Sequence, residues 1–428
     1  MKVVKVSLVI MVLALLTIDL SGMAYAFHSG GVGECGGCHS MHSPKSGGSF
    51  LLVGTDQSST CMTCHLRSGD TGPTSYHVVT ADADMPGGTA PLQRTPGGDF
   101  GWLKKSYTFT IRGTTNIEPG QSHGHNVVAA DFDYIADPDK PTAPGGTFPS
   151  NQLACNSCHD PHGKYRILRN WSIVTTGAPI IGSGSYNNSP IPKPGQAVGV
   201  YRLLAGSGYK TEAAGFIPFP GVPVAVAPST YNQSEATRQV RVAYGHSPTR
   251  SGRTSWDEWC ATCHRQMHSR GNYVHPVDES LGSTHAKIYN KYVNSGNTAG
   301  GNPATAYLSL VPFIEIADYP TLRAHANSNG TYLGGPRLRD QVSCLSCHRA
   351  HASGWEYALR WSMEGGEFIT YADTNGAAVW PGTDTTPTKP ELARGRTSAE
   401  TRAAYYDRDV MVFGAYQRVL CNKCHAKD

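Results

Sequence analysis

The stretch Cys155-Asn-Ser-Cys-His-Asp-Pro-His162 decides the fold, because its first five positions recur along the chain. Two cysteines separated by two residues are followed at once by a histidine, and this motif occurs six times in 428 residues. All 12 cysteines belong to these motifs, so none is left over. The motifs are Cys35/Cys38/His39, Cys61/Cys64/His65, Cys155/Cys158/His159, Cys260/Cys263/His264, Cys344/Cys347/His348 and Cys421/Cys424/His425.

Three chemistries use cysteines in such pairs: disulfide formation in an exported protein, zinc ligation and covalent haem attachment. Only haem attachment requires the histidine, because the two thiols bond to the porphyrin and the adjacent imidazole binds the iron from one face. The motifs therefore predict six covalently bound haem c groups. The cysteines would hold the porphyrins, and the motif histidines would be the proximal iron ligands.

The composition favours a core that is not made of side chains alone. Hydrophobic residues make up 39% of the chain, whereas glycine and proline number 48 and 28. This is less apolar and richer in loop-forming residues than an ordinary globular domain. We therefore predict a multihaem c-type cytochrome fold that is mostly irregular, with short α-helices, little β-structure and the haems forming the core.

Local patterns place a few regular elements in this irregular chain. Apolar periodicity predicts short helices near the attachment sites, at Ser255–His268, Ser283–Val293 and Ala399–Lys423. Strand signals are scarce, and Tyr107–Arg112 shows the best alternation. Stretches rich in glycine, proline, serine and threonine predict loops at 84–101, 137–149 and 176–228.

Residues 1–26 have the composition of a secretory signal peptide. Lys2 and Lys5 precede an apolar run from Val6 to Ile18, and Ala24-Tyr-Ala26 offers a cleavage site. An uncleaved N-terminal anchor is the alternative. We expect an exported protein whose mature part, residues 27–428, is a single domain. The net charge of +4, with no run of lysine and arginine, argues against a nucleic-acid partner.

The remaining histidines supply a second ligand for each iron. The chain has 18 histidines, and a repeat selects among those outside the motifs. The first, third and fifth motifs are each followed by another histidine three residues later and preceded by one further histidine. The repeat predicts three two-haem units, at about 27–120, 121–300 and 301–428. The predicted distal ligands are His28, His42, His125, His162, His325 and His351, with His77 and His275 as reserves.

Other side chains are interpreted less specifically. His123, His246, His268 and His285 lie outside the repeat and are interpreted as surface residues or as contacts of the haem propionates. Methionine is the alternative sixth ligand. The methionines share no position relative to the motifs, so we expect most of them to pack in the protein.

Four stretches, spread from one end of the predicted mature chain to the other, carry a resemblance. They are Phe27-His-Ser-Gly-Gly-Val32, Asp99-Phe-Gly-Trp-Leu-Lys-Lys105, Cys344-Leu-Ser-Cys-His-Arg-Ala-His-Ala-Ser-Gly354 and Leu420-Cys-Asn-Lys-Cys-His-Ala-Lys-Asp428. Through them the chain resembles the OmcS-type outer-surface hexahaem cytochromes of metal-reducing bacteria, the extracellular cytochrome nanowires.

The resemblance implies bis-histidine haems in a continuous row, in which parallel and T-shaped contacts alternate. It implies that copies of the chain join head to tail into a filament, and that His42 binds a haem iron of the neighbouring subunit. Such an open, heterologous contact produces a filament, whereas a closed one produces a ring. The implied partners are further copies of the chain, periplasmic or outer-membrane cytochromes that deliver electrons, and extracellular acceptors such as metal oxides.

Two other functions remain open from the sequence. A monomeric periplasmic or outer-surface electron shuttle would have the same haem chemistry and would differ only in assembly. A multihaem reductase would need an iron with an open distal position, and the surplus of histidines argues against one. We therefore expect an electron-transfer protein and not an enzyme.

Overall fold

The computed structural model describes residues 35–45, 50–67, 76–175, 177–209, 219–228, 241–246, 255–268, 275–291, 311–326, 334–363, 370–408 and 422–425. The predicted signal peptide, His28 and Cys421 lie outside these residues. No helix in the described part of the chain is long and apolar enough to cross a membrane.

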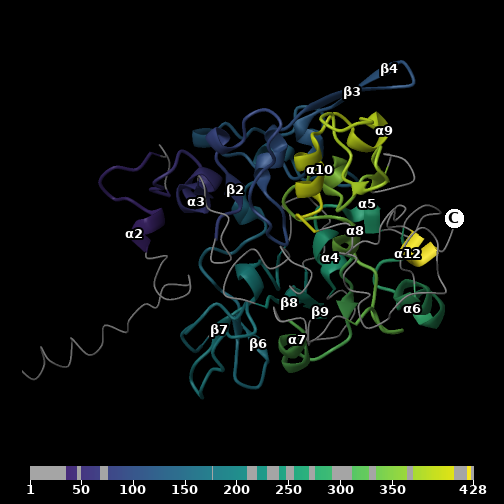
Figure 1. The fold of residues 1–428 in the computed structure, drawn as a ribbon. Coiled ribbons are helices and arrows are strands. Elements are labelled where there is room, and N and C mark those ends of the chain that lie inside the picture. Colours follow the sequence, from purple (N-terminus) through teal and green to yellow (C-terminus); the bar gives the residue numbers. More distant parts are fainter. Residues whose placement is uncertain are drawn as a thin grey trace, which may run out of the picture.

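Most of the described chain is irregular, and its helices and strands are short (Figure 1). The helices are α2 (Cys35–Cys38), α3 (Gln57–His65), α4 (Trp256–Cys260), α5 (Arg265–His268), α6 (Gly282–Lys291), α7 (Tyr319–His325), α8 (Cys344–Cys347), α9 (Pro390–Ala393), α10 (Ser398–Ala404) and α12 (Asn422–His425). The 3-10 turns are η2 (Asp82–Asp84), η3 (Phe100–Lys104), η4 (Gly120–His123), η5 (Ala130–Phe132), η6 (Ser150–Gln152), η7 (Cys155–Ser157), η8 (Tyr201–Leu203) and η10 (Glu356–Ala358).

The strands form five small sheets, each of two or three strands. They are β1 (Leu66–Arg67), β2 (Val79–Thr80), β3 (Tyr107–Ile111), β4 (Thr114–Glu118), β5 (Arg166–Ile167), β6 (Ile173–Val174), β7 (Val198–Gly199), β8 (Val224–Val226), β9 (Ala243–Gly245), β10 (Ile314–Glu315), β11 (Tyr371–Ala372) and β12 (Ala378–Val379). The predicted fold class, mostly irregular with short helices and little β-structure, is confirmed.

The β3–β4 hairpin is the longest strand pair, and it projects from the body of the molecule (Figure 1). It runs from the pair Tyr107↔Glu118 to the pair Ile111↔Thr114. Arg112 and Gly113 both have positive φ, 50° and 82°, as a two-residue turn between twisted strands requires. The strand predicted at Tyr107–Arg112 is therefore present, with its last residue in the turn.

The predicted helices are present but shorter than the sequence suggested. The helix predicted at Ser255–His268 is divided into α4 and α5, and that at Ser283–Val293 is α6. The helix predicted at Ala399–Lys423 is wrong in length. It begins with a capping box between Thr397 and Glu400 and ends at Ala404, because Tyr406 and Asp407 take left-handed conformations with φ of 61° and 54°. Residues 409–421 lie outside the described chain.

The buried side chains form several separate clusters, and motif cysteines lie at the borders of two of them. One cluster gathers Trp102, Trp355 and Tyr405, and Cys347 and Cys424 pack against it. A second cluster contains Trp256 and Trp259, and Cys158 and Cys260 pack against it. The attachment thiols therefore lie where side-chain packing ends, as expected if each porphyrin continues the core.

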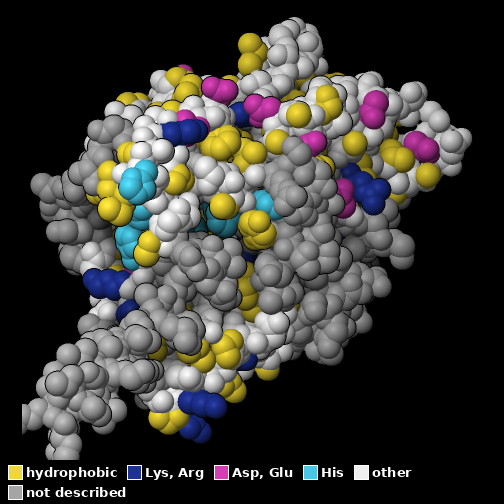
Figure 2. Space-filling view, turned by 90° about the vertical axis from the view of Figure 1, so that its left-hand side faces the viewer, with side chains coloured by type: hydrophobic (Ala, Val, Ile, Leu, Met, Phe, Trp, Pro, Cys, Tyr) yellow, Lys and Arg dark blue, Asp and Glu magenta, His cyan; other side chains and the backbone are white. Residues whose placement is uncertain are grey.

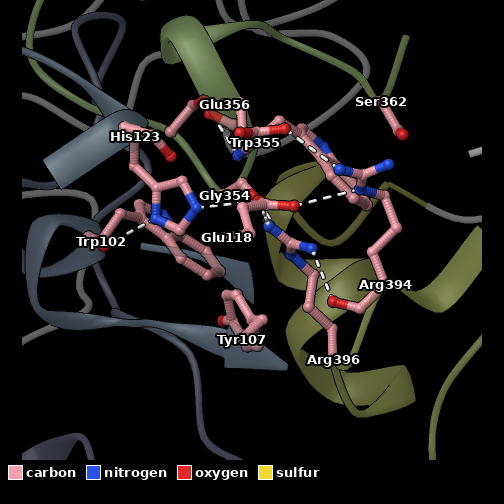
Figure 3. Close-up of polar contacts among 12 residues, drawn as sticks. Trp102, Tyr107, Glu118, His123, Gly354, Trp355, Glu356, Ser362, Arg394 and Arg396 are labelled. Carbon is pink, nitrogen blue, oxygen red and sulfur yellow. Dashed lines mark hydrogen bonds and ion pairs between the residues drawn. The ribbon is translucent and has the colours of Figure 1, made fainter. Parts of the chain in front are cut away.

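A buried ionic network joins the hairpin to the C-terminal part of the chain (Figure 3). Glu118, at the end of β4, accepts hydrogen bonds from His123 Nε2 at 2.9 Å and Arg394 Nε at 3.0 Å, and a third from Arg396. Arg394 also donates to Glu356 at 3.0 Å. These contacts connect the first and third predicted units closely, and the division into three units stays a prediction.

Candidate haem-iron centres

The motif histidines share one local geometry. A helical turn brings the histidine over the first cysteine, and the His39 backbone N–H, for example, donates to the Cys35 carbonyl at 2.8 Å. Five motif histidines also place Nδ1 against a backbone carbonyl. These contacts are His39 with Phe50 at 2.7 Å, His65 with Tyr76 at 2.9 Å, His159 with Arg202 at 2.7 Å, His264 with Pro144 at 2.9 Å and His348 with Tyr357 at 2.7 Å.

A carbonyl oxygen can only accept, so Nδ1 of each of these rings carries the hydrogen. The unprotonated Nε2 of each ring is then available to an iron, and the carbonyl fixes the orientation of the ring. Two histidines outside the motifs show the same arrangement. His125 Nδ1 donates to the Ala350 carbonyl at 2.8 Å, and His351 Nδ1 lies 3.3 Å from the Gly98 carbonyl.

Four motif histidines face a second histidine ring. Two imidazoles on opposite faces of one iron, each with an iron–nitrogen distance of about 2 Å, have ring centroids roughly 6 Å apart. The four observed distances lie between 5.9 and 6.5 Å and so fit this requirement. They are His39–His162 at 6.5 Å, His264–His125 at 5.9 Å, His159–His351 at 6.3 Å and His425–His275 at 6.1 Å.

Burial favours the neutral form of His351 and His125, which is the form that binds a metal. Burial and the neighbouring His159 lower the pKa of His351 to about 3. Burial and His264 lower the pKa of His125 to about 4. An iron between each pair of rings would take the place of the proton that these histidines cannot easily accept.

His77, one of the reserve ligands, lies beside the second motif. The parallel pairing of β1 with β2 brings Leu66 opposite Val79, and the Val78 N–H donates to the His65 carbonyl at 2.9 Å, so His77, the residue before Val78, lies close to His65. Burial lowers the pKa of His65, and His77 lowers it further. His77 is itself only 1% exposed.

The surroundings of His348 and His42 differ from those of the paired histidines. His348 faces no second histidine ring within the described part of the chain. His42 is exposed and makes no polar contact with other described residues, and the neighbouring Met41 is 81% exposed. Figure 2 views the side of the molecule on which α2 lies in Figure 1, and histidine side chains gather there among hydrophobic ones.

The structure gives other surroundings to the remaining histidines. His325, a predicted distal ligand, places Nδ1 2.6 Å from the Glu315 carboxylate, which also pairs with Arg241. His123 is fully buried, and both of its ring nitrogens are engaged, by Glu118 and by the Trp102 carbonyl. His246 contacts Gln341, His268 contacts Asp278 and His285 contacts the Leu281 carbonyl.

Consecutive attachment motifs adjoin one another in chain order. The thiols of Cys61 and Cys155 interact directly, and so do those of Cys260 and Cys344; in each pair this contact raises the pKa of one thiol. Burial is the main cause that raises the pKa of the Cys38 thiol, and the neighbouring Cys64 raises it further. Burial and the neighbouring Cys263 raise the pKa of Cys158 in the same way. Cys347 and Cys424 border the same buried cluster. The cysteines of consecutive motifs therefore lie next to one another along the molecule.

Comparison with known proteins agrees with this geometry. The chain is 51% identical to the C-type cytochrome OmcS of Geobacter sulfurreducens over 447 aligned residues, which cover both chains completely. No protein-family model matches the chain. Two solved structures are similar to it: an Outer Membrane Cytochrome S filament, at 50% identity, and OmcS nanowires, at 51% identity, both from Geobacter sulfurreducens.

Each of these two matches has a TM-score of 0.82 and covers 94% of this chain and 100% of the solved one. Identity of this level over the full length, together with facing histidine rings and adjoining attachment cysteines, shows the family. The chain belongs to the OmcS family of c-type cytochromes, electron-transfer proteins that bind haem c covalently.

Proposed function

We propose that this chain carries six haems in a continuous row and conducts electrons along them as an extracellular filament. The observation that supports this most directly is the set of four histidine ring pairs with the centroid separation of a bis-histidine iron. The adjoining attachment cysteines add the order of the haems, which follows the order of the motifs.

The proposed ligand set differs from the predicted one at two positions. His275, which faces His425, replaces His325, and His77, which lies beside His65, replaces His28. His42 serves the iron of His348 in a neighbouring copy of the chain. The proposed pairs are His39/His162, His65/His77, His159/His351, His264/His125, His425/His275 and His348/His42 of the next subunit.

Haem supplies reversible one-electron transfer at iron, and the residues of this chain control its conditions. Two histidines on each iron leave no coordination position for a substrate, so the sites favour electron transfer over catalysis. A backbone carbonyl on Nδ1 makes the imidazole a stronger donor, which lowers the reduction potential. The fold also keeps successive sites adjacent, and electron transfer needs short gaps because its rate falls steeply with distance.

Assembly into a filament is supported by His42 and His348, because neither ring faces a second histidine ring in the described part of the chain. If His42 of one copy binds the iron at His348 of the next, the first copy still has an iron at its own His348 that can accept His42 from a further copy. Copies can therefore be added without limit and do not close into a ring. Exposed Met41 and Phe50, at 81% and 64%, give the His42 side an apolar surface for that contact. The solved filaments of OmcS support the same assembly.

The location and the partners follow from the proposed filament. Such a filament would lie outside the cell and receive electrons from periplasmic or outer-membrane cytochromes. It would pass them to extracellular acceptors such as metal oxides. No nucleic acid is involved.

The test is a His42→Ala variant compared with wild type and with His285→Ala, which removes an exposed histidine on α6. Electron cryo-microscopy of material sheared from cells should show filaments for wild type and His285→Ala and none for His42→Ala. The purified His42→Ala chain should contain one high-spin haem. Uniform monomers in all three preparations would contradict the filament and leave a monomeric electron shuttle.

A further inference from the structure

Three side chains close to the fourth motif converge on one point. Glu258 lies on α4, His268 is the last residue of α5, and Asp278 lies in the segment before α6. His268 Nε2 lies 3.1 Å from Asp278 Oδ2 and 3.8 Å from Glu258 Oε1. One ligand atom from each of the three lies within 4.8 Å of the others.

These separations suit a metal ion. An ion with metal–ligand distances of about 2.0–2.2 Å in tetrahedral geometry holds its ligand atoms roughly 3.4 Å apart. The two separations from His268, 3.1 and 3.8 Å, lie on both sides of this value, and no two of the three ligand atoms are more than 4.8 Å apart, so side-chain rotations would bring them to it. All three residues are partly buried, which would shield an ion from bulk water.

Surrounding contacts fix Asp278 in this position. Ser255 Oγ donates to Asp278 Oδ2 at 2.7 Å, and the same oxygen caps α4 by accepting from the Glu258 N–H at 3.0 Å. Gln341 donates to the Asp278 carbonyl at 2.7 Å. The other carboxylate oxygen of Asp278, Oδ1, is buried and accepts no hydrogen bond from any described residue. A buried acceptor without a donor is costly, and a cation held by both oxygens of the Asp278 carboxylate would satisfy it.

We propose that Glu258, His268 and Asp278 form a binding site for a first-row divalent cation, separate from the haem irons. One imidazole and two carboxylates suit Zn²⁺, Mn²⁺ or Fe²⁺ rather than the all-oxygen sites of Ca²⁺ and Mg²⁺. Asp257, buried next to the site, increases the negative charge that a cation would offset. Water would fill the remaining positions.

Two of the three residues flank the fourth attachment motif in the sequence. Glu258 is two residues before Cys260, and His268 is four residues after His264. A bound cation adds positive charge near that haem and favours its reduced state, so occupancy raises the reduction potential there. This consequence rests on the proposed electron-transfer function, whereas binding of the cation does not.

Zinc is the probe, because it is absent from haem and has no redox chemistry of its own. The complete haem-loaded protein is stripped with a chelator and dialysed against ZnCl₂, and zinc and iron are counted by mass spectrometry. Wild type should retain one zinc more per chain than His268→Gln and Asp278→Asn. The matched control His285→Gln should retain as much as wild type.

His268→Gln should weaken zinc binding at least 10-fold. Zinc X-ray absorption should report one imidazole with oxygen ligands in wild type. The cation site would be wrong if wild type bound no zinc, or if it bound no more zinc than His268→Gln and Asp278→Asn. Either result would leave the proposed row of haems unaffected. If His268→Gln fails to load haem, Asp278→Asn decides.

A second experiment measures the reduction potentials of the haems. In a spectroelectrochemical titration, zinc should shift one haem component upward in wild type and in His285→Gln, and none in His268→Gln. Zinc bound only by haem propionates would shift all of these proteins alike, and that result would also overturn the proposal.

Discussion

At the scale of the residue, the histidines separate according to what Nδ1 contacts. Five of the motif histidines donate Nδ1 to a backbone carbonyl, which leaves Nε2 for the iron. His325 instead places Nδ1 against the buried carboxylate of Glu315. His275 lies 6.1 Å from His425, ring to ring. The sequence repeat treats His325 as the ligand, and the two assignments can be distinguished by substitution.

His275→Ala should leave one iron five-coordinate, because its second imidazole is lost. About one sixth of the haem should become high-spin, measured by electron paramagnetic resonance and by the optical spectrum. His325→Ala should keep all haems low-spin. The reverse result, with a high-spin haem only in His325→Ala, would restore the ligand set predicted from the sequence.

At the scale of the element, Glu118 anchors the β3–β4 hairpin to the segment between α9 and α10 (Figure 3). Its carboxylate is 1% exposed and faces His123, Arg394 and Arg396. If the negative charge of Glu118 is removed, the buried guanidinium groups of Arg394 and Arg396 lose the carboxylate that compensates their charge. Such an uncompensated charge costs about 3–5 kcal/mol.

Glu118→Gln should therefore lower the free energy of unfolding by about 3–5 kcal/mol, measured by denaturant titration. Glu391→Gln, on α9, is the control and should change it by less than about 0.5 kcal/mol. If the two variants are equally stable, the network contributes nothing.

The same carboxylate makes stability depend on pH. Burial raises the pKa of Glu118, but the hydrogen bond from His123 and the charge of Arg396 outweigh burial and lower it from 4.5 to about 2. A carboxyl whose pKa is lower in the folded state stabilises the fold above pH 4.5, and this contribution is lost as the pH falls toward 2. Wild type should lose more stability between pH 5 and pH 3 than Glu118→Gln does, and parallel curves would refute this.

The N-cap of α3 can be tested in the same way. Asp56 accepts hydrogen bonds from the backbone N–H groups of Ser59 and Ala130, both at 2.7 Å. Asp56→Ala should cost about 1–2 kcal/mol of unfolding free energy, because it exposes the first turn of the helix that carries Cys61 and Cys64. Asp82→Ala, which removes an exposed ion pair with Lys104, should cost much less.

At the scale of the whole molecule, the buried side chains form separate clusters whose borders carry the attachment cysteines. If the proposed haems join these clusters, the chain should not fold without them. Expressed without haem attachment, it should give the circular dichroism spectrum of an unfolded chain with no cooperative melting. A cooperative transition in the haem-free chain would show that side chains alone suffice.

Ligation of the iron by His42 and assembly of the filament can be tested separately. In a His42→Gly variant, added imidazole should bind the vacant iron and restore the low-spin spectrum without restoring filaments, because it cannot link two subunits. Filaments in His42→Gly would show that the apolar contact around Met41 and Phe50 is sufficient for assembly.

The features predictable from the sequence are those made within a few residues. The attachment motif is one such feature. The His159 backbone N–H donates to the Cys155 carbonyl, so both cysteines and the histidine lie within a single turn. The strand that begins at Tyr107 and the helix α6 are likewise determined by local patterns. The helix from Ala399 was overextended because only the backbone of Tyr406 and Asp407, which depends on packing, ends it.

The distal ligands depend on contacts between distant parts of the chain. His159 meets His351, and His425 meets His275, through segments far apart in the sequence. A repeat in spacing cannot separate His275 from His325, because only the folded chain places Glu315 beside His325. The sequence alone thus determined the chemistry and the number of attachment motifs. The tertiary structure decided which histidines face one another, because that depends on long-range packing and not on local spacing.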